Sequence, residues 1–286
     1  GMNSFTGKTR IDAGGTLALA GQGRISASSA VEVNGALDIT AAASAQIKTL
    51  TGSGTIVLGS NYLGITQGSG TFSGAITGAG GVMVTGGNQI FTGSNTFSGT
   101  LGISEGVEVR IGDGGSAGSI AGDVNNWGML VFDRADTLAY GGTISAKGTL
   151  GVTGGGTLLL TGANSFNGNT IIDDATLIIG NGGTGGRLGY GDTIFASTGT
   201  LAFNRSNSYS YGGAIIGNGA LKQIGSGTTI LTGDLTQFSG TTEVSAGTLQ
   251  LRSLPTGDIS VGSTATIDFA LRNDAAYQGT LQGDGL

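Results

Sequence analysis

Polar and apolar residues alternate in many short runs along the whole of this chain. The runs are rich in Thr, Val, Ile and Leu and are bounded by Gly, Asn or Asp; clear examples lie at 90–93, 159–162 and 230–233, each ending in Thr-Gly. Alternation with a period of two is typical of strands that bury one face, and turn residues at both ends favour short strands. We find no amphipathic helix signal of useful length. The pattern therefore predicts an all-β chain.

A phrase made of an aromatic residue, a glycine and an aliphatic residue occurs four times at nearly constant spacing. The copies begin at Phe72, Tyr140, Tyr211 and Tyr277, so they start 68, 71 and 66 positions apart. A repeat this regular indicates a stacked array in which each unit buries its apolar face against its neighbours. We expect one continuous segment over residues 1–286, with sequence units at 1–71, 72–139, 140–210, 211–276 and a partial unit at 277–286.

A second phrase, Phe-x-Gly, indicates how many coils each unit holds. Its copies begin at Phe5, Phe97, Phe166 and Phe238, so the first gap is 92 positions and the later gaps are 69 and 72. The excess is about 23 residues, a plausible length for one solenoid coil, so a unit of about 68 residues fits three coils. Coils of three strands that step along an axis form a parallel β-helix, here with about 12 or 13 coils. The repeated aromatic residues would then mark equivalent corners.

The composition agrees with such a stack. The chain has 60 glycines, but 38% of its residues are hydrophobic and lie in regular runs, which argues against disorder. Its only proline, Pro255, is expected in a turn, since proline cannot donate to a sheet ladder. A net charge of −6 with 12 basic residues argues against a nucleic-acid surface. No run is apolar for the roughly 18–20 residues of a membrane helix, and no stretch has the pattern of a signal peptide.

Two residue types are missing, and their absence removes several kinds of chemistry. The chain has no cysteine, which excludes disulfides, iron–sulfur clusters and thiolate zinc sites. It has no histidine, which excludes the Ser-His-Asp triad and the usual general base. The glycine-rich run 180–185 matches a dinucleotide fingerprint, but no helix is expected after it, so we interpret it as a glycine-rich corner. We predict no cofactor and no metal site.

Carboxylates are the remaining catalytic candidates, at Asp133 with Asp136 and at Asp173 with Asp174. The turn at 133–136, Asp-Arg-Ala-Asp, recurs at 204–207 as Asn-Arg-Ser-Asn and roughly at 272–274. A turn that recurs with its acids replaced by Asn is typical of structural capping, with the arginine paired locally. Glycosidic chemistry requires two placed carboxylates. We therefore expect no catalytic residues and no enzyme.

One unit differs from the others on its expected outer face. Leu130 and Phe132 are apolar in every copy and should point inward, which leaves Trp127, Met129 and Val131 pointing outward. The corresponding positions of the later units are mostly Thr, Ala and Asp. An outward apolar cluster with tryptophan is a candidate partner-binding surface, and a loop folded over it is the alternative.

The runs at 154–170 and 92–99 resemble the passenger-associated transport repeat of bacterial autotransporters, and the run at 232–238 departs from it by one additional residue and a missing Asn. The resemblance covers the chain well from about residue 72 onward. It implies a right-handed β-helical passenger that is exported through, and tethered by, its own C-terminal outer-membrane barrel. Nothing in the chain resembles that barrel. We therefore interpret the chain as a segment of a longer passenger.

The resemblance implies an extracellular protein, either anchored at the bacterial cell surface or secreted. We expect an adhesin or virulence factor, or its display stalk, that recognises a host surface protein, a glycan or another passenger without catalysis. Two alternatives stay open. One is a polysaccharide lyase or hydrolase on the same fold that uses the carboxylates, and the other is a released effector that binds a host receptor.

Overall fold

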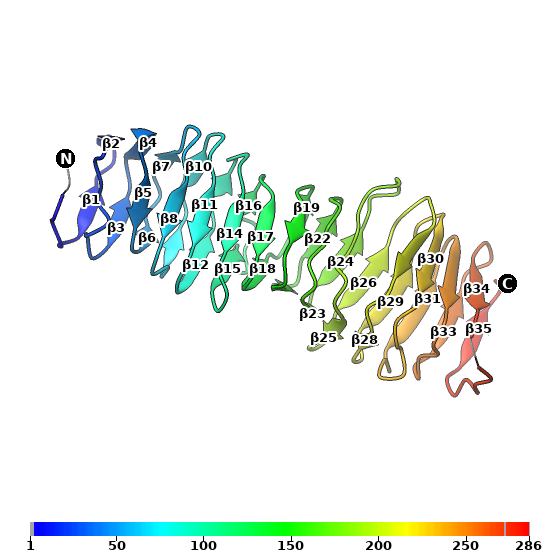
Figure 1. Ribbon diagram of the computed structural model, residues 1–286. Helices are drawn as coiled ribbons and strands as arrows, with labels where there is room; N and C mark the ends of the chain where they lie inside the picture. Colours follow the sequence, from blue (N-terminus) through cyan, green and yellow to red (C-terminus); the bar gives the residue numbers. More distant parts are fainter. Residues whose placement is uncertain (1–2, 272, 286) are drawn as a thin grey trace. The chain divides into compact units, whose positions relative to one another are not determined.

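The computed structural model describes residues 3–271 and 273–285. The chain divides into two compact units, one formed by residues 1–134 and 142–148 and the other by residues 135–141 and 149–286. In each unit, strands of successive coils pair in parallel (Figure 1). The described residues contain no helix, and so none that could span a membrane. The prediction of an all-β chain is confirmed, and the fold is a right-handed parallel β-helix.

The first unit stacks its short strands into parallel ladders, each advancing by one coil per strand. One ladder holds β1 (Thr9–Ile11), β3 (Val31–Val33) and β6 (Leu50–Thr51), and another holds β2 (Thr16–Gly21), β4 (Ala36–Ala42), β7 (Thr55–Val57) and β10 (Ala75–Thr77). A third ladder holds β5 (Ala45–Ile47), β8 (Leu63–Ile65), β11 (Val82–Val84), β14 (Leu101–Ile103), β17 (Val124–Asn126) and β20 (Ile144–Ser145). The others hold β9 (Thr71–Phe72), β12 (Asn88–Phe91), β15 (Glu108–Ile111) and β18 (Met129–Asp133), and the pair β13 (Ser94–Asn95) and β16 (Ser119–Ile120).

The second unit has the same construction. One ladder holds β21 (Thr149–Thr153), β23 (Thr170–Ile172), β25 (Thr193–Phe195) and β28 (Ile215–Ile216). The longest holds β19 (Thr137–Tyr140), β22 (Thr157–Leu160), β24 (Thr176–Ile179), β26 (Thr200–Phe203), β29 (Ala220–Gln223), β31 (Thr241–Val244), β33 (Ile259–Val261) and β35 (Leu281–Gly283). A third holds β27 (Tyr209–Tyr211), β30 (Thr228–Leu231), β32 (Thr248–Leu251) and β34 (Thr266–Phe269).

Most coils are somewhat shorter than the sequence repeat led us to expect. Leu63, Val82 and Leu101 are successive ladder partners, and the equal steps between their positions measure the length of one coil. The steps vary elsewhere because the corner loops differ in length: the step from Thr242 to its partner Ile259 is short, and the step from Thr176 to Thr200 is long. The shorter coils give about 14 turns, slightly more than the 12 or 13 predicted.

The expectation that the repeated aromatic residues mark equivalent corners is wrong. In the second unit, Tyr140, Leu160, Ile179 and Phe203 are in register across three coils, and Tyr211 follows soon after Phe203. Three coils therefore use most of the chain between the two tyrosines, and the short remainder after Phe203 supplies one further corner and strand. As a result, Tyr211 lies in the ladder of β27, whereas Tyr140 lies in that of β19. From Tyr140 to Tyr211, the repeated phrase therefore shifts from one face of the coil to another.

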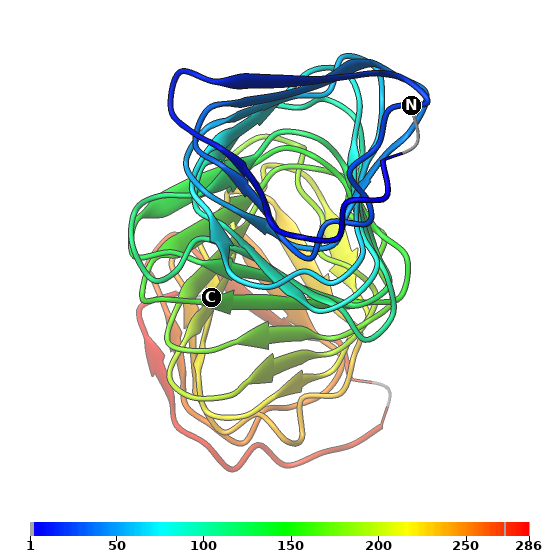
Figure 2. The same cartoon turned by 90° about the vertical axis from the view of Figure 1, so that its left-hand side faces the viewer.

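In each unit, buried residues at alternate positions of most strands fill the interior, and the chain winds around it in successive coils (Figure 2). Ile172 and Phe203 are fully buried, as expected, and so are most of the aliphatic residues at alternate strand positions. The rings of Phe203 and Tyr211 lie 6.3 Å apart inside the second unit. Pro255 lies in the connection between β32 and β33, where no ladder donor is lost, so the prediction for proline is confirmed.

Candidate functional site

The repeated arginine turn is structural in both units. In the first unit, Arg134 is almost buried and donates to the carbonyl of Gly118, while the Gly114 N–H donates to the Asp133 carbonyl at 3.0 Å. The Asp133 carboxylate accepts a hydrogen bond from Arg110 at 2.8 Å. Asp133 is therefore engaged in an ion pair with Arg110.

The second unit repeats this geometry with different residues. Arg205 donates to the carbonyls of Gly186 and Thr184, and the Gly182 N–H donates to the Asn204 carbonyl at 2.8 Å. The glycine-rich corner is thus held by the arginine of the next coil, and no helix follows it. The interpretation of 180–185 as a corner is confirmed. Arg272, the third expected copy of the arginine, lies outside the described residues.

Other carboxylates cap the turns of neighbouring coils. The side chains of Asp123, Asp192 and Asp258 accept backbone N–H groups of Thr143, Ala214 and Thr280, at 2.7, 2.8 and 2.8 Å. These side chains satisfy backbone donors at corners where the sheet ladder is interrupted.

Asp173 and Asp174, the other catalytic candidates, both lie exposed in the turn before β24. Asp173 accepts a hydrogen bond from the Ser197 hydroxyl at 2.6 Å, and Asp174 accepts one from the Thr198 hydroxyl at 3.1 Å. Both aspartates therefore bind hydroxyl groups of the next coil.

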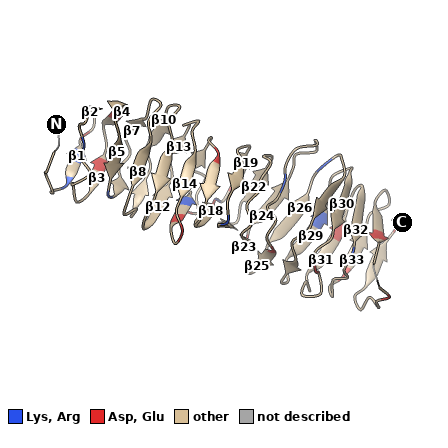
Figure 3. Ribbon diagram, viewed as in Figure 1, with Lys and Arg blue, Asp and Glu red and all other residues tan. Residues whose placement is uncertain are grey.

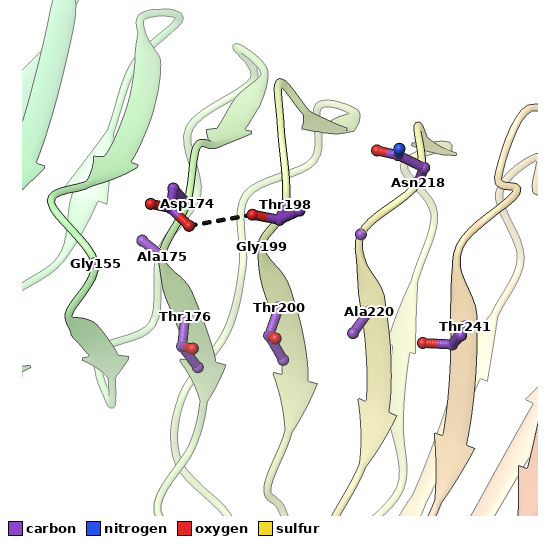
Figure 4. A pocket seen from close by; sticks show the side chains of 11 residues that line it. Gly155, Asp174, Ala175, Thr176, Thr198, Gly199, Thr200, Asn218, Ala220 and Thr241 are labelled. Atoms are coloured by element: carbon purple, nitrogen blue, oxygen red, sulfur yellow. Dashed lines mark hydrogen bonds between the residues drawn. The ribbon is translucent and has the colours of Figure 1, made fainter.

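A polar groove crosses successive coils of the second unit beside Asp174. Its volume is about 420 Å³, and its base carries a row of ladder partners, Thr176, Thr200, Ala220 and Thr241 (Figure 4). Asp174 is the only carboxylate among the residues that line it. The groove offers hydroxyl groups to a ligand, but it does not contain the two carboxylates that glycosidic cleavage uses.

The asparagine of the repeated Thr-Gly-x-Asn phrase is also structural. Asn95 donates to the carbonyls of Gly93 and Ser119, both at 3.1 Å, and its own oxygen accepts the N–H of Ile76. Asn164 donates in the same way to Gly162 and, at 2.7 Å, to Arg187. In the third copy a fully buried leucine, Leu235, occupies this place.

The three residues predicted as a partner-binding surface differ in exposure. Trp127 directly follows β17 and is 50% exposed, so no loop covers it. Met129 is half-buried. Val131 is only 2% exposed and lies in register with Arg110 of the preceding coil, so the expectation that it offers an outward surface is wrong. Strand parity puts Val131 on the opposite side from Leu130, but a side chain on that side can still be covered by its neighbours.

The structure adds two residues to this surface that sequence reasoning missed. Tyr62, which immediately precedes β8, is 55% exposed, and Met83, in the middle of β11, is 40% exposed. The strands β8 and β11 belong to the same ladder as β17, which Trp127 follows. We call Tyr62, Met83 and Trp127 the aromatic face.

The outer surface of this sheet is uncharged around Met83. The ladder partners in the row of Met83 are uncharged residues, namely Gln46, Gly64, Gly102, Asn125 and Ser145. A Cβ atom on Gly81 would collide with the Tyr62 ring, and one on Gly102 would collide with the Met83 sulfur. The Tyr62 and Met83 side chains thus pack over glycines of the next coil, a placement that depends on the register between the coils.

Comparison with known proteins agrees with this architecture. The model of the passenger-associated transport repeat matches residues 1–19, 86–107, 150–179 and 221–251. The chain is 32% identical over 189 residues to the adhesin BmaC autotransporter of Brucella suis, covering 54% of this chain and 6% of that protein. It is 27% identical over 281 residues to the uncharacterized lipoprotein YdeK of Escherichia coli, covering 94% of this chain and 19% of that protein. No solved structure matches. Together with the parallel β-helix, the matched repeats support an autotransporter passenger built from passenger-associated transport repeats.

Proposed function

We propose that this passenger acts as an adhesin, at the bacterial surface or after secretion, by non-catalytic contact with a host surface protein, a glycan or another copy. The observation that carries the proposal is the aromatic face: three large side chains stand exposed on or beside the strands of one ladder, and the ladder partners of Met83 are uncharged. Aromatic residues and methionine are enriched where proteins bind partners. The adhesin name of the Brucella relative supports the same class.

A non-catalytic role is supported by the way the candidate carboxylates are used. Asp133 is paired with Arg110, and Asp173 and Asp174 bind hydroxyl groups of the following coil. Hydrolysis of a glycosidic bond typically uses two carboxyl groups that flank that bond, one as acid and the other as base or nucleophile. An acid-dependent cleavage of polysaccharide by the purified chain would contradict this role.

Adhesion of the purified chain to cultured host cells, and to itself on coated beads, tests the proposal. Replacement of Tyr62, Met83 and Trp127 by Ser should lower bound cells or bead aggregation at least about tenfold, because each truncated anchor at a contact centre costs more than about 1 kcal/mol. The matched control is Gln46→Ala with Asn125→Ala, which changes polar residues of the same sheet face. Equal adhesion of the two variants would overturn the aromatic face as the contact surface.

A further inference from the structure

A second cleft, in the second unit, has a different chemistry from the aromatic face. It has a volume of about 420 Å³ and is lined by the end of the glycine-rich corner and by the turn after β26. Its charged residues are Arg187 and Arg205, and hydroxyl groups of Thr184, Ser208 and Ser210 complete its walls. Figure 3 shows how sparse charged residues are along the chain, so two arginines in one cleft are unusual for it.

The internal repeat supplies a reference for this cleft. Equivalent hydrogen bonds align the two copies: Asn95 donates to the carbonyl of Ser119, and Asn164 donates to that of Arg187. Arg187 thus stands where the first copy has a serine.

The same alignment shows that the second copy carries fewer acids than the first. The first copy carries aspartate at three positions where the second copy carries asparagine, namely Asp113, Asp133 and Asp136 against Asn181, Asn204 and Asn207. At these aligned positions the second copy therefore has three fewer negative charges than the first and, with Arg187, one more positive charge.

The arginines of the second copy have no acid partner. Among the described residues, no carboxylate lies within ion-pair distance of Arg187 or Arg205, whereas Arg110 of the first unit pairs with Asp133 at 2.8 Å and Glu108 at 3.0 Å. The Arg205 guanidinium is instead fixed by the carbonyls of Gly186 and Thr184 and by the Asn207 side chain at 3.1 Å. Carbonyl groups orient a guanidinium without neutralising its charge.

Two tyrosines hold the arginines in place. The Arg187 guanidinium lies 4.3 Å from the ring centre of Tyr190, and that of Arg205 lies 4.9 Å from the ring centre of Tyr209. The Tyr209 hydroxyl accepts the N–H of Leu188 at 3.1 Å, so its own proton is available to an acceptor. Burial raises the pKa of Tyr209, and the hydrogen bond from Leu188 and the charges of Arg187 and Arg205 oppose that rise.

We propose that this cleft binds a carboxylate or sulfate group carried on a sugar chain. Arg187, half-exposed and without an acid partner, donates to the anion, and the fixed charge of Arg205 adds to the attraction. The hydroxyls of Thr184, Ser208 and Ser210 bind sugar hydroxyls. Tyr190 lies against Arg187 beside the cleft and is 52% exposed, so it offers a ring face or edge to the part of the sugar that extends from the cleft. The walls contain glycine, alanine and hydroxyl residues but no deep apolar pocket for peptide side chains, which favours a glycan over a phosphorylated peptide. The inference rests on the proposed adhesive function and names a ligand class for it.

Binding of the purified chain to two acidic sugars tests this site. Heparin oligosaccharides supply sulfate, oligogalacturonate supplies carboxylate, and dextran is the neutral control; affinities are measured by calorimetry at physiological ionic strength. Arg187→Gln should weaken binding at least about tenfold, because it removes the available donor. Lys147→Gln removes the same charge from an exposed position of the first unit and should have no effect. The double variant Asn181→Asp, Asn204→Asp restores two acids of the first copy and should also weaken binding.

Each result of these binding experiments either supports the proposed site or overturns it. Binding of heparin alone, oligogalacturonate alone or both, with the Arg187 dependence, supports the proposal and identifies the anion. Binding of neither sugar, equal loss in the Arg187 and Lys147 variants, or Arg187-dependent binding of a phosphopeptide but not of sugars overturns it. Cell adhesion that depends on the aromatic face but not on Arg187 would leave the adhesive function standing while this inference fails.

Discussion

Replacing Phe203 by alanine tests how the interior of the second unit is held together. Phe203 is fully buried at the end of β26, in register with Ile179 of the preceding coil and Gln223 of the following one. Its ring lies 5.9 Å from that of Tyr209 and 6.3 Å from that of Tyr211. The side chain therefore fills the space between three coils.

The expected loss of unfolding free energy is about 3–5 kcal/mol, the usual cost of truncating a buried phenylalanine. Of this, the two ring contacts contribute about 0.5–1.5 kcal/mol each, and lost apolar burial with the remaining cavity accounts for the rest. The upper part of the range is expected because strands in a ladder of fixed register cannot move inward to fill the cavity. Phe203→Leu keeps much of the volume and should cost less than half as much.

Guanidinium unfolding followed by circular dichroism measures the effect as a shift in the midpoint. The control is Glu243→Gln, which removes an exposed ion pair with Lys222 of the same unit and should change stability by no more than about 0.5 kcal/mol. If Phe203→Ala and Glu243→Gln shifted the midpoint equally, the assignment of inward and outward faces would be refuted.

Other predictions concern the repeat motif, the tyrosines and the ends of the chain. Asn164→Ala should lower the free energy of unfolding by about 1–3 kcal/mol, because it leaves buried carbonyl groups unpaired. Asn164→Leu should lower it less, because the third copy of the motif holds a buried leucine, Leu235, at this place. Urea unfolding compares the two variants. Burial raises the pKa of Tyr211. The stability that Tyr211 contributes is therefore fully present below the pKa of an unfolded tyrosine, about 10, and is lost as the pH rises further. Tyr211→Phe should flatten this alkaline loss of stability, and an unchanged loss in the variant would contradict the prediction. Hydrogen exchange should be fastest in the terminal strand β35, which is exposed along its length, and slow in β24 and β26; equal protection in a monomeric sample would mean that the end is capped.

Much of the secondary structure could be read from local pattern alone. A period of two with glycine, asparagine and aspartate at the borders determines short strands, because side chains of a strand alternate between core and solvent. The turn at 133–136 could be recognised as structural because its copy at 204–207 keeps the arginine and replaces the acids with amides that cap equally well. Pro255 fell in a connection for a similarly local reason, the missing N–H.

Register and coil length were decided only by the tertiary structure. Corner loops of different length make the coils unequal. The period of the sequence repeat therefore could not show that Tyr211 lies a few residues beyond three complete coils from Tyr140, in a different ladder. The burial of Val131 depends on its neighbours on adjoining strands, which parity cannot supply. Tyr62 and Met83 are exposed across glycines of the following strand, and Arg187 meets Arg205 because one coil separates them. Each of these features arises between coils, at positions one coil apart in the sequence, where strand pairing rather than local propensity determines which side chains meet.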